Sequence, residues 1–221
     1  GSGRLDNAGL MRKTGTAGLT LAMPLTNIGT LRIESGTLTA SAFPVNAGTL
    51  DVFDSAALIT ANNSLQNNGV IQGGGAINLG AGTLTNAGAL RPGNGAAAGT
   101  LAITGNLIQT AAGLIEADVL GTTAAQQDHV TVTGSATLDG DLVLSPSQSL
   151  TFGAQDRYTV LSCGAEGCLS GSFSSIETGG LAATATFFSN ALSFATGTIA
   201  STWISTTSGF WDVAANWANS L

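Results

Sequence analysis

The stretch TNIGTLRIESGTLTASAFPVNAGTLDV, residues 26–52, contains the phrase Asn-x-Gly-Thr-Leu twice, first at Asn27 and again at Asn46. The shorter phrase Asn-x-Gly recurs in phase through the first half of the chain. The asparagines that open these phrases are Asn7, Asn27, Asn46, Asn67 and Asn86. An apolar residue follows each of them by four positions, namely Met11, Leu31, Leu50, Ile71 and Leu90. The chain therefore contains an internal repeat with a period of about 20 residues.

The segments between the asparagines alternate between apolar and polar residues, as β-strands do. Leu31-x-Ile33 and Leu50-x-Val52 are two such segments, and no stretch holds the 3.6-residue period of a helix. The period also suits a leucine-rich repeat, but the L-x-x-L-x-L phrase of that class is absent. The repeat therefore predicts an all-β fold, a right-handed parallel β-helix with one coil per repeat and rungs about 4.8 Å apart.

The Asn-x-Gly phrase is predicted to form one corner of every coil. Asparagine and glycine tolerate the positive φ angles that a sharp corner can require. Stacked asparagine side chains can also hydrogen-bond along the rod as a ladder. We therefore interpret the five repeated asparagines as a structural ladder rather than as ligand-binding residues.

The chain is predicted to divide into three parts. Residues 3–104 hold the repeated rungs. A sixth repeat would begin at Asn106, but Ile108 stands where glycine is expected, so the asparagine pattern is predicted to end there. Residues 105–198 contain longer alternating segments, and we expect a β-rich continuation that ends or caps the solenoid, because an open end exposes unpaired strand edges. Residues 199–221 are predicted to be a linker or the start of a following module.

The composition excludes several classes of function. Only 9% of the 221 residues are charged, against about 25% in ordinary soluble domains. A net charge of −7 with six basic residues leaves no face for nucleic acid or for an anionic membrane surface. No apolar run approaches the roughly 20 residues of a membrane span. We expect Gly1-Ser2 to be a cloning remnant on an excised fragment.

The two cysteines are predicted to form a disulfide. Cys163 and Cys168 are separated by four residues, of which two are glycines, so the loop can close. In the loop-entropy model such a ring stabilises the fold by roughly 2 kcal/mol. A zinc site would need more ligands than the single histidine, His129, can supply. A cysteine nucleophile with His129 as its base has nothing to orient it, so we expect no metal and no cofactor.

Parallel β-helices can also carry polysaccharide-active enzymes, which need carboxylates gathered on one face. The candidate carboxylates are Asp51, Asp54, Asp118, Asp128, Asp139 and Asp141. Two of them, Asp51 and Asp54, are three positions apart and would face opposite sides of a strand. The segment Asp139-Gly140-Asp141 is more typical of a hairpin turn.

Two other titratable groups fit the same structural interpretation. Asp128-His129 has the pattern of the start of a strand, and Lys13, the only lysine, lies in the first rung and far from the carboxylates. We therefore expect no catalysis, and a β-helical polysaccharide-active enzyme or glycan-binding module is the alternative.

The chain resembles large bacterial surface proteins. Its rungs resemble the β-helical shaft of filamentous haemagglutinin-type proteins, and its second half resembles the C-terminal passenger region of autotransporters. The segments that carry the second likeness are Gly88–Asn94, Gly99–Leu101, Thr104–Asn106, Gln127–Asp128, Val132–Gly134, Leu138–Leu142, Tyr158–Leu161 and Gly171–Phe173. The resemblance implies export through the outer membrane to the bacterial cell surface, and a structural shaft or display segment of an adhesin. Its acidic, Thr- and Asn-rich exterior would suit weak multivalent contact with host or cell-surface glycans and proteins, or with neighbouring copies.

The C-terminal segment holds all three tryptophans, Trp203, Trp211 and Trp217. It resembles the W…GxWxxxxNW phrase that opens new modules in bacterial exoproteins. We interpret it as a strand and turn that pack on the end of the rod, with an aromatic sugar-binding platform as the alternative. Binding to an ice or crystal surface is a third class of function. It would require a Thr-x-Thr pair at one position in every rung, and only Thr37-x-Thr39 and Thr83-x-Thr85 suggest such a column.

Overall fold

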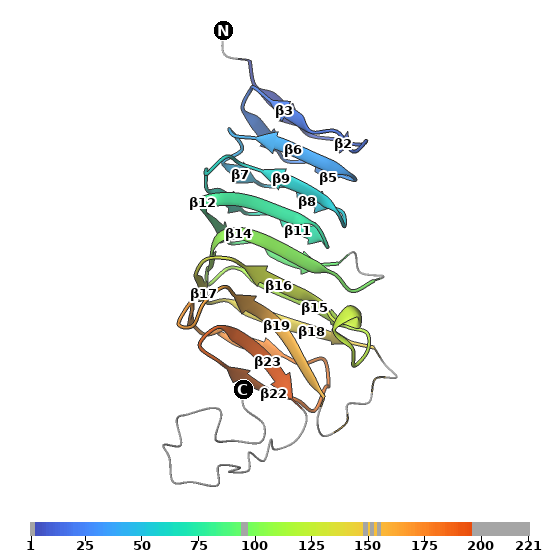
Figure 1. The fold of residues 1–221 in the computed structure, drawn as a ribbon, viewed down its shortest axis with the longest axis vertical. Helices are drawn as coiled ribbons and strands as arrows, with labels where there is room; N and C mark the ends of the chain where they lie inside the picture. The colour runs from blue at the N-terminus through green and yellow to red at the C-terminus, as the bar shows by residue number, and fades with distance from the viewer. Residues whose placement is uncertain (1–2, 94–96, 148–149, 151–152, 154–155, 196–221) are drawn as a thin grey trace.

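The computed structural model describes residues 3–93, 97–147, 150, 153 and 156–195. In this part of the chain the regular structure consists of β-strands and one short 3-10 turn, η1 (Ala124–Gln126), so the fold is all-β. The strands stack along the long axis from the N-terminal end toward the C-terminal end (Figure 1). Each pass of the chain adds strands to three stacks of strands. We call them the first, second and third column, in the order in which the chain enters them.

The second column is an eight-stranded sheet in which each strand pairs in parallel with the equivalent strand of the next pass. Its strands are β2 (Leu10–Lys13), β5 (Thr30–Ile33), β8 (Thr49–Val52), β11 (Val70–Gly73), β13 (Ala89–Pro92), β15 (Leu114–Val119), β18 (Asp141–Pro146) and β21 (Ser175–Glu177). The period of the sequence repeat is thus the length of chain between neighbouring strands of this sheet.

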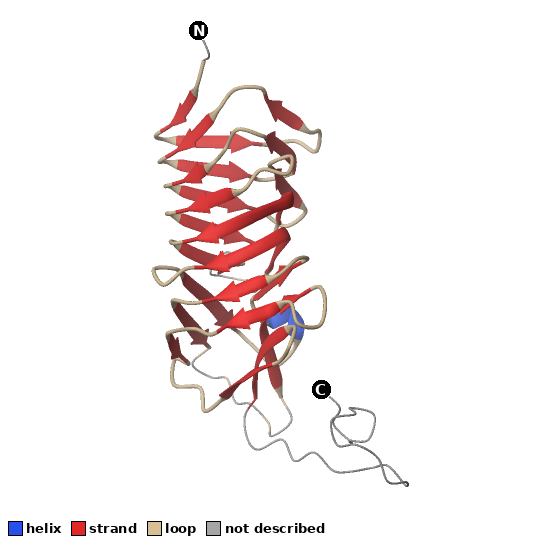
Figure 2. Cartoon of the chain, turned by 90° about the vertical axis from the view of Figure 1, so that its left-hand side faces the viewer, coloured by secondary structure: helices blue, strands red, loops and turns tan. Residues whose placement is uncertain are grey.

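The first and third columns belong to one fifteen-stranded sheet, because β12 (Ala76–Asn86) and β14 (Thr100–Gln109) run from the third column into the first. The other strands of the first column are β1 (Leu5–Asn7), β4 (Leu25–Asn27), β7 (Val45–Asn46), β10 (Leu65–Asn67), β17 (Ala136–Leu138) and β20 (Leu169–Gly171). Those of the third column are β3 (Leu19–Leu21), β6 (Gly36–Ala40), β9 (Ala56–Ile59), β16 (His129–Val132), β19 (Arg157–Cys163), β23 (Ala191–Ala195) and β22 (Thr184–Phe187). Figure 2 shows the stack from the side.

The repeated apolar positions set the register of the second column. The pairs in this row are Leu31 with Leu50, Leu50 with Ile71, Ile71 with Leu90, and Leu90 with Ile115. All five side chains are completely buried. Burial of each such side chain contributes about 1.5–3 kcal/mol, so the interior row explains why the pattern of the sequence fixes the pairing. A shift by one residue would turn the whole row outward.

The glycines of the repeat are required by close packing, not by their φ angles. A Cβ atom on Gly48 would overlap the carbonyl oxygen of Gly29, and Gly69 and Gly88 stand in the same relation to the preceding corner. Neither these glycines nor the repeated asparagines have positive φ angles. The expectation that the corner needs the left-handed region is therefore wrong. The corner needs glycine because successive backbones approach too closely for a side chain.

The stack continues past the boundary expected between residues 104 and 105. That boundary lies inside β14, and parallel pairing continues in the first two columns to β20 and β21. The pairing changes only at the C-terminal end of the third column, where β23 lies antiparallel to both β19 and β22. The β22–β23 hairpin thus pairs with the edge of β19 at this end of the stack. Residues 199–221 lie outside the described part.

Candidate functional site

The five repeated asparagines lie in one row at the end of the first column. Each donates a hydrogen bond from its side-chain Nδ2 to the Oδ1 of the next, at 2.7 Å from Asn7 to Asn27, 2.8 Å from Asn27 to Asn46, 2.8 Å from Asn46 to Asn67 and 2.7 Å from Asn67 to Asn86. The last four are completely buried. Amides buried in this way satisfy one another, so the structure brings these residues together as a ladder, with no side exposed to a ligand.

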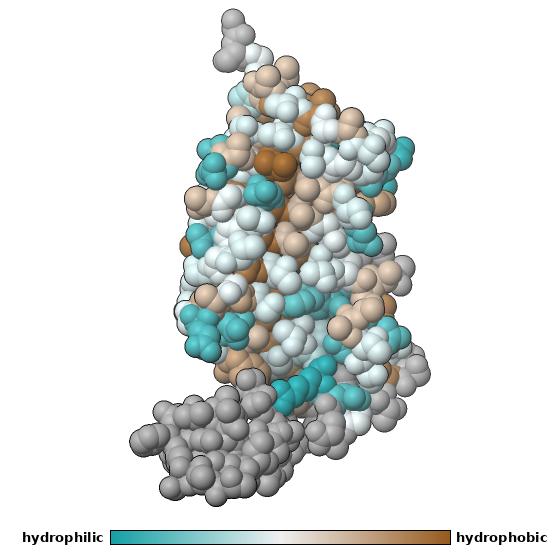
Figure 3. All heavy atoms as spheres, viewed as in Figure 1, coloured by the Kyte–Doolittle hydropathy of each residue, from teal (hydrophilic) through white to brown (hydrophobic). Residues whose placement is uncertain are grey.

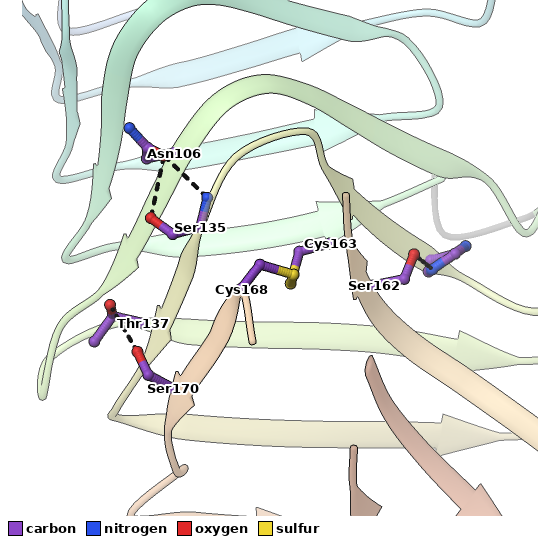
Figure 4. Close-up of a disulfide and its surroundings, with 8 residues drawn as sticks. Asn106, Ser135, Thr137, Ser162, Cys163, Cys168 and Ser170 are labelled. Carbon is purple, nitrogen blue, oxygen red and sulfur yellow. Dashed lines mark hydrogen bonds between the residues drawn. A yellow bond between two sulfur atoms is a disulfide. The ribbon is translucent and has the colours of Figure 1, made fainter. Parts of the chain in front are cut away.

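The row has a sixth member that the repeat did not reveal. Gln109 pairs with Asn86 in the sheet, and its Oε1 accepts a hydrogen bond of 2.8 Å from Asn86 Nδ2. Asn106, where the asparagine pattern is predicted to end, is outside the row. It pairs with Thr83, and its Oδ1 accepts hydrogen bonds from the backbone and hydroxyl of Ser135 (Figure 4). The side-chain amide of Gln109 could have identified it as a member of the row. Its distance along the chain from Asn86 is greater than the spacing of the repeat, however, so it is out of phase with the asparagines.

The two cysteines form a disulfide at the corner between β19 and β20 (Figure 4). Their Cα atoms are 6.1 Å apart. The backbone N–H of Cys163 donates to the carbonyl of Asn190, and the carbonyl of Cys168 accepts from Ala136, both at 2.8 Å. The crosslink therefore joins a corner that is already held on both sides. The other expected site, the tryptophans Trp203, Trp211 and Trp217, lies outside the described residues.

Ion pairs occupy the outer face of the second column. Arg12 donates two hydrogen bonds of 2.8 Å to the carboxylate of Glu34. Arg32 donates from Nε to Asp51 Oδ2 at 2.9 Å. A third pair of this kind joins Arg91 to Glu116. Three of the six basic residues of the chain are thus neutralised beside the sheet, which leaves little positive charge for an anionic partner.

Two adjoining hollows lie beside these pairs, where the chain leaves the second column. The larger has a volume of about 320 Å³ and is lined by residues that include Gln72, Arg91, Glu116, Asp118 and Asp128. The smaller has a volume of about 130 Å³ and is lined by residues that include Asp51, Phe53, Asp54 and Gly74. Both hollows are lined by Gly93. They therefore adjoin at Gly93. We call the two hollows together the acidic groove, and this groove is the candidate binding site.

Asp128 connects three segments at the wall of the groove. Its Oδ1 accepts from the backbone N–H of Gly99 at 2.8 Å, and its Oδ2 accepts from that of Asp118 at 2.9 Å. Its backbone carbonyl accepts from the Tyr158 hydroxyl at 2.7 Å. Burial raises the pKa of Asp128 to about 7, although the two N–H donors oppose the shift. Because both carboxylate oxygens are occupied by backbone groups, Asp128 acts as a structural connection and not as a free acid or base.

Neighbouring titratable groups are also engaged. Burial, and secondarily the Glu116 carboxylate, raise the pKa of Asp118. Burial lowers the pKa of His129, whose Nε2 lies 2.9 Å from Ser162 Oγ. Lys13 is buried, and its ammonium group donates to three backbone carbonyls at its own end of the stack. Within the described ranges no three His, Cys, Asp or Glu side chains are placed to hold a metal ion.

The segment around Asp139 and Asp141 forms a corner and not a hairpin. It joins β17 of the first column to β18 of the second, which belong to different sheets. Asp139 accepts hydrogen bonds from the N–H of Gly140 at 2.7 Å and from the Ser174 hydroxyl at 2.8 Å, and these lower the pKa of its carboxyl group. This segment therefore turns the chain, as a turn dipeptide does, but between columns.

The two Thr-x-Thr pairs do not form a common array. Thr39 pairs with Ile59 in the third column, whereas Thr85 pairs with Ile108 in the first. Figure 3 shows one face of the stack, on which weakly polar and apolar side chains predominate. The column required for binding to an ice or crystal surface is therefore absent from the described rungs.

No protein-family model matches the chain, and no curated protein is similar to it in sequence. Among the described residues there is no helix with the length and apolarity needed to cross a membrane.

Proposed function

We propose that the chain is a segment of a right-handed parallel β-helix that serves as the shaft or display rod of a large, exported bacterial surface protein and supports adhesion. One observation carries the proposal: the second column pairs in parallel, pass after pass, from β2 to β21. A fold built in this way extends by adding equivalent rungs, so its length and not a single pocket is the property that the sequence maintains.

The energetics of the stack suit a rod. Each rung contacts mainly its neighbours through backbone hydrogen bonds, the apolar interior row and the amide ladder. Stability is then a sum over rungs and interfaces between rungs. Such a rod can hold a functional domain at a distance from a cell without depending on any one polar side chain.

Location and partners are part of the proposal. Disulfides persist in oxidising compartments outside the cytosol, and the Cys163–Cys168 bond is compatible with such a place. The net charge of −7 and the abundant uncharged polar residues favour soluble, weakly binding surfaces. Many copies on one cell would add weak contacts to glycans, to proteins or to one another into a firm attachment.

The polysaccharide-active alternative is best tested at the acidic groove. An enzyme would lose turnover of pectin, alginate, starch or peptidoglycan on Asp118→Asn while it remained folded. A rod has no turnover to lose, with or without Ca²⁺.

Deletion of one complete rung tests the proposal. Removal of residues 67–85 joins Gln66 to Asn86, which occupy consecutive register positions. Asn86 then falls on Asn46, Leu90 on Leu50 and Arg91 on Asp51. We expect the shortened protein to keep its β-sheet circular dichroism and a cooperative unfolding transition. A control deletion of residues 67–76, half a rung, puts the strands out of phase and should unfold the protein. Equal damage from the two deletions would refute the rod.

A further inference from the structure

The smaller hollow of the acidic groove contains a buried acceptor without a donor. The Asp51 side chain is 4% exposed, and its Oδ2 accepts from Arg32 Nε at 2.9 Å. Its Oδ1 has no hydrogen-bond partner among the described residues. A buried carboxylate oxygen without a donor is costly and calls for an explanation, such as a ligand that the folded protein binds.

An aromatic ring lies beside this carboxylate. Phe53 also lines the hollow and is 38% exposed. The guanidinium carbon of Arg32 lies 5.6 Å from the centre of the ring. Arg32 therefore lies over the ring and holds the carboxylate at the same time, and its side chain is 36% exposed.

The rest of the lining lets a flat ligand approach closely. Asp54 is exposed and lies over Gly74, where a Cβ atom would overlap its Oδ1. Gly73 and Gly93 also line the hollow, together with the carboxylate residue Glu34. A ligand in the hollow would therefore lie between an aromatic side chain and the carboxylates of Asp51 and Asp54, with Glu34 as a third acidic residue of the lining. Binding sites for small molecules commonly combine such apolar surface with a few acceptors.

We propose that this hollow binds one uncharged sugar ring. The C–H face of the sugar packs on Phe53, and its hydroxyl groups donate to Asp51 Oδ1 and to the Asp54 carboxylate. Because Oδ1 is closed to solvent, the sugar gains this acceptor when the Arg32 guanidinium moves off the Phe53 ring while its Nε stays bonded to Asp51 Oδ2.

Charge decides the class of sugar. The hollow itself is lined by Glu34, Asp51 and Asp54, and the chain carries a net charge of −7, so uronates and sialylated sugars are repelled. The described carboxylates do not converge in a metal-binding group, so the acceptor is assigned to hydroxyl donors and not to a cation. The sugar site is a separate proposal from the rod. A rod without a sugar site would still remain folded when one rung is deleted, so the two proposals can fail independently.

The test is a titration of the whole chain with neutral oligosaccharides of glucose, galactose, mannose and N-acetylglucosamine, with oligouronates, and with CaCl₂ alone, followed by NMR. We expect at least one neutral oligosaccharide to bind and the oligouronates and CaCl₂ to leave the spectrum unchanged. Phe53→Ala and Asp54→Asn should each weaken binding at least tenfold. Both residues are exposed, so the variants should fold, which circular dichroism checks.

Phe187→Ala is the matched control, because Phe187 is a similarly exposed phenylalanine, at 42%, on the hairpin at the other end of the stack. It should leave the affinity unchanged. Three results would overturn the site: no neutral sugar binds, CaCl₂ or oligouronates bind instead, or Phe53→Ala binds as well as Phe187→Ala.

Discussion

Asn67 donates a hydrogen bond from Nδ2 to Oδ1 of Asn86 at 2.7 Å, and both side chains are completely buried. Every bond of the row from Asn7 to Gln109 runs in this same direction, from one rung to the next along the chain. Each inner amide is therefore both donor and acceptor. Hydrogen bonds arranged head to tail polarise one another, so the middle of the row should be more sensitive to substitution than its end.

The first prediction concerns the middle of the ladder. Asn67→Asp keeps the shape and the acceptor for Asn46, but it removes the donor to Asn86 and buries a negative charge beside an oxygen. We expect the free energy of unfolding to fall by about 3 kcal/mol or more, since a buried, unpaired polar group loses its solvation. Urea unfolding measures the loss. Asn68→Asp, on the exposed neighbour, should change stability by less than about 0.5 kcal/mol; a similar cost at both positions would contradict the ladder.

The second prediction concerns the end of the ladder. Gln109 Nε2 is buried without a hydrogen-bond partner in the described structure, because the next residue in its row is Leu138, as the pairing of Ile108 with Thr137 requires. Asn86 Nδ2 also has carbonyl acceptors, at 3.1 Å in Gly88 and 3.3 Å in Leu114.

Gln109→Leu should therefore cost less than Asn67→Leu, by at least about 1 kcal/mol. The comparison is made by chemical denaturation of the two variants. Equal costs would mean that the position in the row does not matter.

These residues also show how far the sequence can predict the fold. The nearly constant spacing of the repeat predicts both the interior row, which includes Leu50, and the amide row, which includes Asn46. Equivalent residues of successive rungs lie in register, so they meet the same environment and must be of the same kind. The step lengthens to 23 residues between Asn86 and Gln109. Counting in steps of about 20 residues reaches Asn106, where the asparagine pattern is predicted to end, and it therefore misses the glutamine. The repeat also predicts the corner glycines for the wrong reason, namely positive φ angles. They are needed because neighbouring rungs approach closely, and this contact cannot be seen in the sequence of a single rung.

The contacts that form the acidic groove could not be predicted from the sequence. Asp128 is separated from Gly99 by 29 residues and from Tyr158 by 30, and those contacts exist only because consecutive rungs stack. Its pattern does place it before a strand, β16, as expected. Its buried position and its bonds to two backbone N–H groups follow from the neighbouring rungs and not from its own segment.

The third prediction is a pH dependence from Asp128. The native carboxyl keeps its proton up to about pH 7, whereas the unfolded one releases it near pH 3.8. The native state therefore binds more protons between these values, and this group's contribution to stability falls as the pH rises through that window. The raised pKa of Asp118 acts in the same direction, and the lowered pKa of His129 acts in the opposite one.

Asp128→Asn isolates the contribution. The stability of the wild type minus that of Asp128→Asn should be smaller at pH 8 than at pH 4.5, in urea unfolding at constant ionic strength. A difference that stays constant or grows with pH would show that this carboxyl is ionised in the fold at low pH.

The fourth prediction concerns the disulfide. Replacing both Cys163 and Cys168 by alanine should lower the free energy of unfolding by about 2 kcal/mol, the loop-entropy contribution of a short ring. The far-ultraviolet circular dichroism should not change, because backbone hydrogen bonds to Ala136 and Asn190 hold the corner independently. Mass spectrometry of the non-reduced wild type should detect no free thiol. Loss of the folded state in the double variant would show that the crosslink, and not the stacking, holds this end together.

The last prediction concerns the interior row. Leu50 is completely buried between Leu31 and Ile71, and Leu50→Asp places a charge in a narrow apolar interior that has no water to solvate it. The effective penalty is several kcal/mol, comparable with the whole stability of a domain, so we expect the protein to lose its cooperative thermal transition. Leu10→Asp makes the same chemical change at a leucine that is 59% exposed, and this variant should keep the transition. If Leu50→Asp unfolded as cooperatively as Leu10→Asp, the row could not be the element that binds one rung to the next.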